Sequence, residues 1–403
     1  MAHIYRSLED AVSLLLERVS PLAQTEEIPL LQALNRVCAG DMTAVVDHPP
    51  FDRSPLDGYA ARSEDLEGAS FSAPAVLRVT QRIYAGQVSP GPLKPGTCAR
   101  IMTGAPIPPG ADCVIRQEDT DLGEEQVRIS VSSAPHRNIC DRGEDLRAGA
   151  PILSRGTCLT PAHLGVLAGQ GLDRVSVYAP LKVGVLATGD ELVPPGSPLP
   201  PGKIYNSNGT YLSARLCQLG MYPVVEPRGS DRLEVLTASL EALLDRCAAV
   251  LSTGGVSVGE RDLMPAALEA LGAQVLFHGV AVKPGSPVLA AMVRGKPVLC
   301  LSGNPFAAAA TFEVVARPPL CRLAGWSAPM PRRVSGVLTS AFPKASPSRR
   351  LVRARLEGSA VSLPSGAHVS GALSALIGCN CLIDIPAGSP PLAANTPVEV
   401  VLL

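Results

Sequence analysis

The sequence predicts a chain of several domains, in which an α/β domain is flanked by two regions of short strands. Three observations lead to this fold class. Between residues 180 and 327, apolar runs of strand length alternate with segments of helix length, as in a parallel sheet covered by helices. Residues 46–138 and 328–403 contain short β-like runs separated by turn-forming residues. The length of 403 residues also leaves room for several domains, at roughly 100–200 residues each.

The composition excludes several classes of protein. Hydrophobic residues make up 46% of the chain, which is enough for packed cores and excludes a wholly disordered protein. The net charge of −1 argues against nucleic-acid binding, because counterion release needs an excess of cationic groups. No apolar run reaches the ~18 residues of a membrane span. The 11 scattered cysteines, with no CxxC pair, favour free buried thiols in a reducing cytoplasm over a metal site.

The N-terminal half is predicted to combine short helices with a β module. A helix is expected over residues 7–19, where apolar residues recur at helical spacing after a Ser7 N-cap. Shorter helices are expected over residues 29–35 and 161–169. The all-β module between them is expected to contain strands at residues 76–84, 98–102, 113–117 and 126–131.

The α/β region and the C-terminal region can be assigned element by element. Strands are expected at residues 181–188, 221–226, 248–253 and 274–282, and helices at residues 208–219, 232–246 and 263–271. Residues 288–301 are expected to form a hairpin. A long helix is expected over residues 305–323, with Asn304 as its cap and Pro305 in its first turn. The last domain is expected to contain strands at residues 332–338, 351–357 and 398–403.

Glycine-rich loops follow three strands of the predicted α/β sheet. They read Thr188-Gly189-Asp190, Thr253-Gly254-Gly255 and Ser302-Gly303-Asn304. Ligands bind beyond the carboxyl ends of such strands, and glycine lets backbone N–H groups approach an anion closely. A Walker A site is excluded, because Glu260 stands where that motif needs a lysine. An ordinary tight turn would explain one such loop, but three at one edge favour a phosphate-binding site.

Three carboxylates also follow strands of this sheet: Glu191, Asp231 and Asp262. Carboxylates would repel phosphates unless Mg²⁺ bridges the two, since Mg²⁺ takes one or two carboxylates together with substrate phosphates. Helix capping is the alternative for Asp231 and Asp262, which both precede predicted helices. The two functions are compatible, and the spacing alone leaves both open.

Two segments of the β module are unusual for surface loops. Residues 49–60 pack turn-forming residues around Asp57 and Tyr59, and residues 100–112 follow a strand and contain Thr103. Rigid turn structure alone would explain both segments. Together with the loops of the α/β region, however, they form an ordered series of motifs. The series is Phe51-Asp52-Arg53-Ser54-Pro55-Leu56-Asp57-Gly58-Tyr59-Ala60, Ile101-Met102-Thr103-Gly104-Ala105, Gly143-Glu144-Asp145, Thr188-Gly189-Asp190-Glu191-Leu192, Ser252-Thr253-Gly254-Gly255-Val256-Ser257-Val258-Gly259, Lys283-Pro284-Gly285 and Gly303-Asn304-Pro305.

This series, which covers most of the chain, resembles the MoeA family of molybdopterin molybdenumtransferases, which includes the E domain of gephyrin. The resemblance implies an elongated, multidomain α/β plus β chain. Residues 1–45 and 139–176 would form a helical and mixed linker domain, and residues 46–138 an inserted β module. Residues 177–327 would form a MogA-like three-layer α/β/α domain that binds molybdopterin, and residues 328–403 a C-terminal β-barrel-like domain. The resemblance also implies a homodimer with its active cleft between the β module of one protomer and the α/β domain of the other.

The activity that the resemblance implies is the last step of molybdenum cofactor synthesis. Adenylylated molybdopterin and molybdate would give the cofactor, with release of AMP and a need for Mg²⁺. The family's catalytic positions fall on Asp57, Thr103, Glu191, Asp231 and Asp262, of which Glu191, Asp231 and Asp262 would hold the metal. The substrate-binding positions fall on Gly254, Gly255, Ser257, Lys283, Gly285, Gly303 and Asn304. A molybdopterin adenylyltransferase is a further expected partner.

The sequence departs from the family pattern on its anion-binding side. Ser286, Cys140 and Ser374 stand where the pattern has cations. These losses leave open a catalytically weakened protein that serves as a scaffold or binds a partner, as gephyrin does, although the intact acids argue against it. The molybdopterin adenylyltransferase itself is a second alternative. The β module and the C-terminal β domain argue against it, because that enzyme is essentially the α/β domain alone.

Overall fold

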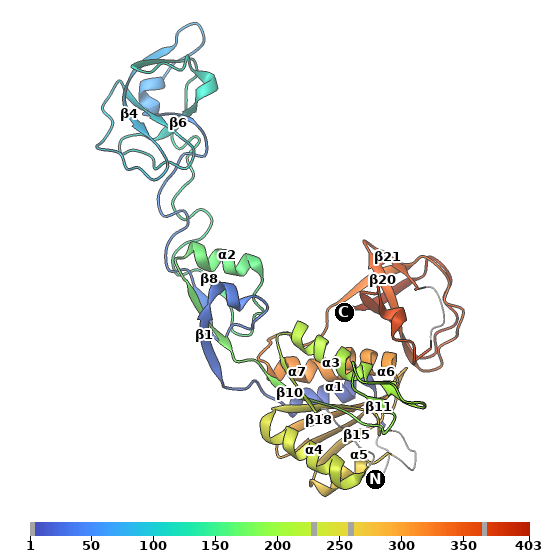
Figure 1. Cartoon of the computed structure of the whole chain (residues 1–403). Coiled ribbons are helices and arrows are strands. Elements are labelled where there is room, and N and C mark those ends of the chain that lie inside the picture. The colour runs from blue at the N-terminus through green and yellow to red at the C-terminus, as the bar shows by residue number, and fades with distance from the viewer. Residues whose placement is uncertain (1–4, 227–231, 257–261, 365–368) are drawn as a thin grey trace. The chain divides into compact units, whose positions relative to one another are not determined.

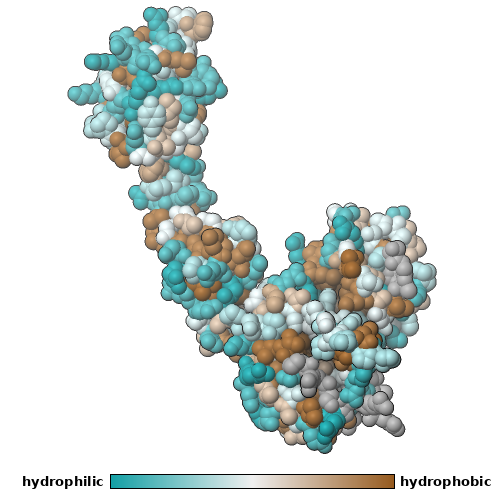
Figure 2. All heavy atoms as spheres, in the orientation of Figure 1, coloured by the Kyte–Doolittle hydropathy of each residue, from teal (hydrophilic) through white to brown (hydrophobic). Residues whose placement is uncertain are grey.

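The computed structural model describes residues 5–226, 232–256, 262–364 and 369–403. Its contacts divide the chain into two compact units (Figure 1). The large unit contains Met1–Gly40, Arg155–Thr160 and Arg174–Leu403, and the small unit contains Asp41–Ser154 and Pro161–Asp173. Figure 2 shows hydrophilic and hydrophobic residues interspersed on the visible faces of both units. Among the described residues, no helix has the length and apolar character needed to cross a membrane.

A six-stranded sheet forms the centre of the large unit. Its order is β13 (Tyr222–Glu226), β10 (Lys182–Ala187), β14 (Ala249–Thr253), β18 (Lys296–Leu301), β17 (Leu289–Val293) and β15 (Gln274–His278). β10 pairs in parallel with β13 and β14, and β14 pairs in parallel with β18. β17 runs antiparallel to both its neighbours, and it forms with β18 the hairpin predicted from the sequence.

Helices cover both faces of this sheet, as the alternation of strands and helices predicted. On one face, α1 (Leu8–Glu17), α3 (Ser207–Gln218), α6 (Pro305–Thr311) and α7 (Arg317–Leu323) contribute to one apolar core. On the other face, α4 (Leu233–Arg246) and α5 (Met264–Ala270) contribute to a second core. Successive strand side chains point to opposite faces. Leu251 of β14 therefore belongs to the first core and Val250 to the second.

A local capping signal predicted the start of the first helix correctly, whereas the second expected helix differs in the structure. The Ser7 hydroxyl accepts a hydrogen bond from the Asp10 N–H at 3.0 Å, which confirms the cap of α1. The helix expected over residues 29–35 is only a 3₁₀ turn, Leu30–Ala33. It follows β1 (Thr25–Pro29), which pairs with β9 (Arg174–Tyr178). That long-range pairing places Pro29, the first residue of the expected helix, in a strand.

The helix expected over residues 305–323 is interrupted. A π-helical turn, Phe312–Ala316, separates α6 from α7. Asn304 occupies the N-cap position, as expected, but its side chain makes no capping hydrogen bond. The Phe306 N–H, which such a cap could have satisfied, instead donates to the Ser370 carbonyl at 2.9 Å. Pro305 does occupy the first turn, as expected.

The C-terminal strands close into a five-stranded barrel. Going round it, the strands are β20 (Arg349–Glu357), β21 (Ala360–Ser362), β19 (Arg333–Leu338), β23 (Pro397–Leu402) and β22 (Cys381–Ile385), which returns to β20. β21 and β22 had no counterpart in the sequence prediction. The strand predicted over residues 274–282 is in fact two, because Gly279 adopts φ +126° and ends β15. Beyond it, β16 (Val282–Lys283) pairs with β20 at the edge of the barrel.

The small unit contains the predicted β module. Its sheet has the order β6 (Cys113–Arg116), β3 (Gly58–Ala61), β5 (Thr97–Ile101), β4 (Ala75–Ile83) and β7 (Gln126–Ile129). β2 (Met42–Thr43) pairs with β8 (Pro151–Leu153), and α2 (Pro161–Gly169) has the bounds predicted for it. Gly58 is required, since a Cβ there would lie 1.9 Å from the Ile115 carbonyl oxygen.

A buried ion cluster joins two of the helices of the large unit. Glu313, in the π-helical turn, is fully buried and accepts from Arg215 of α3 at 2.7 Å and from Arg317 of α7 at 3.0 Å. Removing one member of such a cluster leaves buried charge without compensation.

We expect Glu313→Ala to lower the free energy of unfolding of the large unit by about 3–5 kcal/mol, because two guanidinium groups lose their common counter-ion. Urea unfolding followed by circular dichroism measures the change. Glu241→Ala, which breaks an exposed pair with Arg294, is the matched control and should cost less than about 1 kcal/mol. Equal losses in the two variants would contradict the prediction.

Candidate functional site

A cavity of about 590 Å³ lies at the carboxyl ends of β10, β14 and β18. The three glycine loops predicted to meet at this edge line it together. Of the predicted site residues, Glu191, Asp262, Gly254, Gly255, Gly303 and Asn304 line it. The prediction that Glu191 and Asp262 share one cleft is therefore confirmed, whereas their chemical roles remain predictions.

Close backbone approach explains the glycine at the centre of the cavity. Gly254 adopts φ +90°, and a Cβ on it would lie 2.6 Å from the Thr188 carbonyl oxygen. The Gly254 N–H donates to the Leu301 carbonyl at 3.1 Å, and the Thr188 N–H donates to the Thr253 carbonyl at 2.9 Å. The ends of β10, β14 and β18 are thus tied to one another by backbone hydrogen bonds.

The amino-terminal end of α3 forms a further wall of the cavity. The Asn206 Oδ1 caps the helix by accepting from the Gly209 N–H at 2.9 Å. The Asn208 Nδ2 donates to the Thr253 Oγ1 at 2.9 Å and to the Gly303 carbonyl at 2.8 Å. Sequence reasoning assigned no role to either residue. An asparagine before an apolar helical pattern is a capping signal, so only Asn206 could have been found that way.

The carboxylates occupy the rim of this cavity. Glu191 is exposed and lies over Gly189, where a Cβ would be 2.5 Å from the glutamate Oε1. Asp262 is half-buried. Asp231 and Ser257 lie outside the described residues. Within the described parts of the chain, no three Asp, Glu, His or Cys side chains gather as a metal site.

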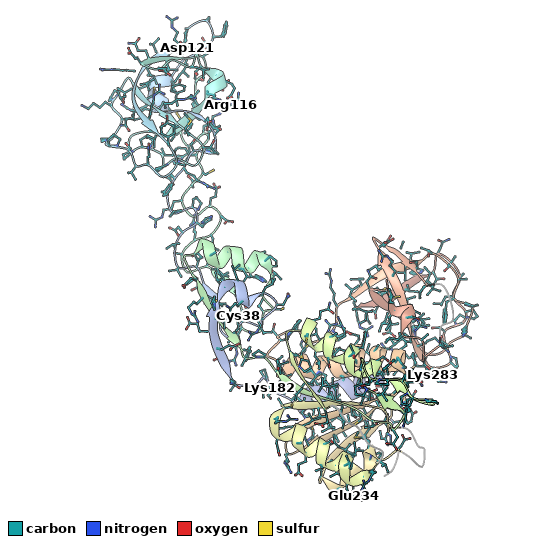
Figure 3. All side chains as sticks on the ribbon, in the orientation of Figure 1. Cys38, Arg116, Asp121, Lys182, Glu234 and Lys283 are labelled. Atoms are coloured by element: carbon teal, nitrogen blue, oxygen red, sulfur yellow. The ribbon has the colours of Figure 1, made fainter. Side chains whose placement is uncertain are left out.

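Lys283 does not line this cavity but a second one. That cavity has a volume of about 230 Å³ and contains Lys283, Lys344, Arg350 and Ser370. Lys283 reaches it because β16 pairs with β20, which places Lys283 opposite Arg350. Figure 3 labels Lys283 in the large unit. Gly285 follows with φ +95°, where a Cβ would lie 2.5 Å from the Thr311 Cγ2. The sequence motif alone gave no sign that Lys283 and the glycine loops face different cavities.

The second cavity is strongly cationic. Its described lining residues include the three cations Lys283, Lys344 and Arg350 and no carboxylate. Ser286, where the family pattern has a cation, instead donates its hydroxyl to the Val282 carbonyl at 2.7 Å and closes the turn. Lys344 and Arg350 were not identified from the sequence, because they belong to the C-terminal region and match none of the motifs.

Asp57 and Thr103 meet in the small unit. The Thr103 N–H and hydroxyl both donate to the Asp57 Oδ1, each at 2.8 Å. These bonds, the backbone one first, lower the pKa of the Asp57 carboxyl. The two motif segments are joined again where the Gly104 N–H donates to the Ser54 carbonyl at 2.8 Å. The carboxylate is thus kept charged and held in place.

We expect Thr103→Val to raise the pKa of Asp57 toward the ordinary value of about 3.9, because one of two hydrogen bonds to the charged form is lost. The shift is incomplete, since the backbone bond remains. A depressed carboxyl pKa contributes stability above the unfolded value, and that stability is lost as the pH falls through the folded pKa. The Thr103→Val variant therefore loses less stability than the wild type as the pH falls. Carboxyl-carbon NMR titration measures the pKa of Asp57, and Thr103→Ser, which keeps the hydroxyl, is the control. An unchanged pKa of Asp57 in Thr103→Val would contradict the prediction.

Comparison with known proteins places the whole chain in one family. Residues 6–171 match the model of the MoeA N-terminal region (domain I and II), and residues 184–322 match a probable molybdopterin binding domain. Residues 335–403 match the MoeA C-terminal region (domain IV).

Relatives and solved structures agree with these matches. A molybdopterin molybdenumtransferase of Staphylococcus aureus is 36% identical over 378 residues, 93% of this chain and 90% of the relative. Molybdopterin molybdenumtransferase 2 of Mycobacterium tuberculosis is 38% identical over 383 residues, 93% and 94% of the two chains. A crystal structure of the molybdopterin biosynthesis MoeA protein from Pyrococcus horikoshii superposes with a TM-score of 0.86 at 29% identity, covering 98% and 99% of the chains.

The multidomain fold class expected from the sequence is confirmed, with a molybdopterin-binding type of α/β domain and a closed C-terminal barrel. The order of the motifs, the three matched regions and the relatives at 36–38% identity agree. The chain belongs to the MoeA family of molybdopterin molybdenumtransferases.

Proposed function

We propose that this protein is a molybdenum insertase, which transfers molybdenum from molybdate into adenylylated molybdopterin and releases AMP. One observation carries the proposal most directly. In a chain of this family, glycine loops and two carboxylates line a single cavity at the carboxyl edge of the α/β sheet. Its volume of about 590 Å³ lies within the ~300–1,000 Å³ of ordinary small-molecule sites.

The glycine loops are suited to the phosphates of the substrate. Gly254, Gly255 and Gly303 leave the backbone uncovered by side chains, and because the Gly254 N–H is bonded to the Leu301 carbonyl, the N–H groups of Gly255 and Gly303 are the ones that would reach phosphate oxygens. Asn304 stands beside them at the start of α6. In this proposal the pyrophosphate bridge of adenylylated molybdopterin lies along these loops.

Glu191 and Asp262 fit the requirements of Mg²⁺. Mg²⁺ prefers oxygen ligands and is usually bound by one or two carboxylates with substrate phosphates completing its shell. Two carboxylates on one rim, beside a phosphate site, match that pattern. When bound, Mg²⁺ would neutralise charge on the phosphates. Asp231, outside the described residues, remains a candidate third ligand.

The carboxylates of this chain would also orient the attacking water. A carboxylate near the adenylyl phosphorus can accept a proton as the water oxygen bonds to phosphorus and the bond to the molybdopterin phosphate oxygen breaks. The products of that step are AMP and the phosphorylated molybdopterin. Asp57, held charged by Thr103, would join from the partner protomer of a homodimer.

Molybdate would bind in the second cavity. Molybdate is a small dianion, and three cations around about 230 Å³ supply the charge it needs. A non-catalytic scaffold would need neither this cavity nor the acids of the first. The adenylyltransferase alternative is disfavoured, because the matches to both the N-terminal and the C-terminal region extend well beyond an α/β domain. The cytoplasmic location, the Mg²⁺ requirement and a molybdopterin adenylyltransferase partner belong to the same proposal.

The proposal is tested by Asp262→Asn, which keeps the size of the side chain and removes its charge. We expect molybdate- and Mg²⁺-dependent AMP release to fall by roughly 100-fold or more, because losses of metal-site support already reach 10–100-fold. Asp245→Asn, at an exposed ion pair on α4, is the control and should keep full activity. Wild-type turnover by Asp262→Asn would show that Asp262 is only structural.

The cationic cavity predicts a second result. We expect Lys344→Gln to raise the molybdate concentration needed for half-maximal AMP release about three- to tenfold, with little change in kcat. The effect should shrink at high salt, where charge is screened. Lys94→Gln, an exposed lysine of the small unit, is the control. An unchanged molybdate dependence would exclude Lys344 from the site.

The shared cleft is tested by mixing inactive variants. If Asp57 and Asp262 serve one cleft from different protomers, Asp57→Asn and Asp262→Asn homodimers are both inactive. A heterodimer would then have one cleft with both changes and one with neither. Random subunit exchange should restore about a quarter of wild-type activity, since half of the dimers are mixed and half of their clefts are intact. No recovery, despite exchange seen by native mass spectrometry, would refute the shared cleft.

A further inference from the structure

The side chain of Asn208 connects loops that are distant in the sequence. From the first turn of α3, its amide nitrogen reaches Thr253, the last residue of β14, and Gly303, which follows β18, at 2.9 and 2.8 Å. The Thr253 hydroxyl in turn donates a hydrogen bond to the Ser302 carbonyl at 2.8 Å. Both amide hydrogens of Asn208 are therefore used, one for each loop.

The third loop is attached to the same turn of α3 through the backbone. β11 (Leu192–Val193) pairs in parallel with β12 (Ile204–Tyr205), just before α3 begins. The Ile204 N–H donates to the Glu191 carbonyl at 2.8 Å, and the Asn206 N–H donates to the Val193 carbonyl at 2.9 Å. The position of Glu191 is thus coupled to the start of α3.

Asp262 is coupled to the other end of this network. It lies two residues before Met264, whose N–H donates to the Gly255 carbonyl at 3.4 Å. Gly255 follows Thr253 by two residues, so this bond connects the start of α5, next to Asp262, with the segment whose hydroxyl Asn208 binds. The amide of Asn208 is one of the links between these loops, beside the N–H and hydroxyl of Thr188, which donate to the Thr253 carbonyl at 2.9 and 3.4 Å.

We propose that Asn208 is a positioning residue, which sets the separation of Glu191 and Asp262 and thereby the affinity of the cavity for a divalent cation bound with a pyrophosphate group. This inference rests on the proposed function for the identity of the natural substrate. Asn208 acts through the two groups it binds, the Thr253 hydroxyl and the Gly303 carbonyl. The chemistry selects asparagine, because aspartate has the same shape and no N–H to donate.

The test uses Mn²⁺ with inorganic pyrophosphate as the probe, because electron paramagnetic resonance follows Mn²⁺ binding without any turnover. We expect Asn208→Ala and Asn208→Asp to weaken Mn²⁺–pyrophosphate binding by about tenfold. Thr253→Val, which removes the hydroxyl at nearly constant shape, should do the same, and Thr253→Ser should retain most of the binding. Asn208→Ala combined with Thr253→Val should be no worse than either alone, since coupled residues are not additive.

A purely structural role would give a different pattern. Ser7→Ala removes the α1 cap and should lower the melting temperature while binding stays unchanged, so it controls for stability alone. Wild-type binding in Asn208→Ala, strictly additive losses, or no Mn²⁺–pyrophosphate binding by the wild type would each overturn the inference. AMP release is measured separately. If the binding pattern holds but no AMP is released from adenylylated molybdopterin, the proposed function fails and the positioning role of Asn208 stands.

Discussion

The candidate site depends on one steric constraint: three loops approach at the carboxyl edge of the sheet more closely than side chains allow. A Cβ on Gly254 would lie 2.6 Å from the Thr188 carbonyl oxygen, so this position must be glycine. The consequence is a wall of exposed backbone rather than of side chains. That wall suits a polyphosphate, and the charged side chains among its described lining residues are the carboxylates of Glu191 and Asp262.

The helices that begin at this edge are joined to each other deeper in the protein. α3 carries Asn206 and Asn208 at its start, and α6 starts beside Asn304. Further along, Arg215 of α3 binds the buried Glu313 in the π-helical turn that continues α6. The ion cluster is costly to bury, and its contacts connect α3 with α7 through the π-helical turn.

Charge is separated between two cavities of the large unit. The first has carboxylates and backbone N–H groups, suited to a metal and phosphates, and the second has Lys283, Lys344 and Arg350, suited to a free dianion. The pairing of β16 with β20 produces this separation, because it carries Lys283 away from the glycine loops to the barrel. The C-terminal region supplies the other two cations of the second cavity, Lys344 and Arg350.

Local patterns in the sequence determined the elements and the family. The helix over residues 161–169, the Ser7 cap, the hairpin of β17 and β18 and the meeting of Glu191 with Asp262 all followed from periodicity, capping chemistry and the common edge of parallel strands. The tertiary structure alone decided the cavity that Lys283 faces, the π-helical break at Phe312–Ala316 and the two bonds of the Asn208 amide. Each depends on a partner distant in the chain. A sequence pattern indicates which residues are buried and which form turns. It does not indicate which residue distant in the chain each of them will contact.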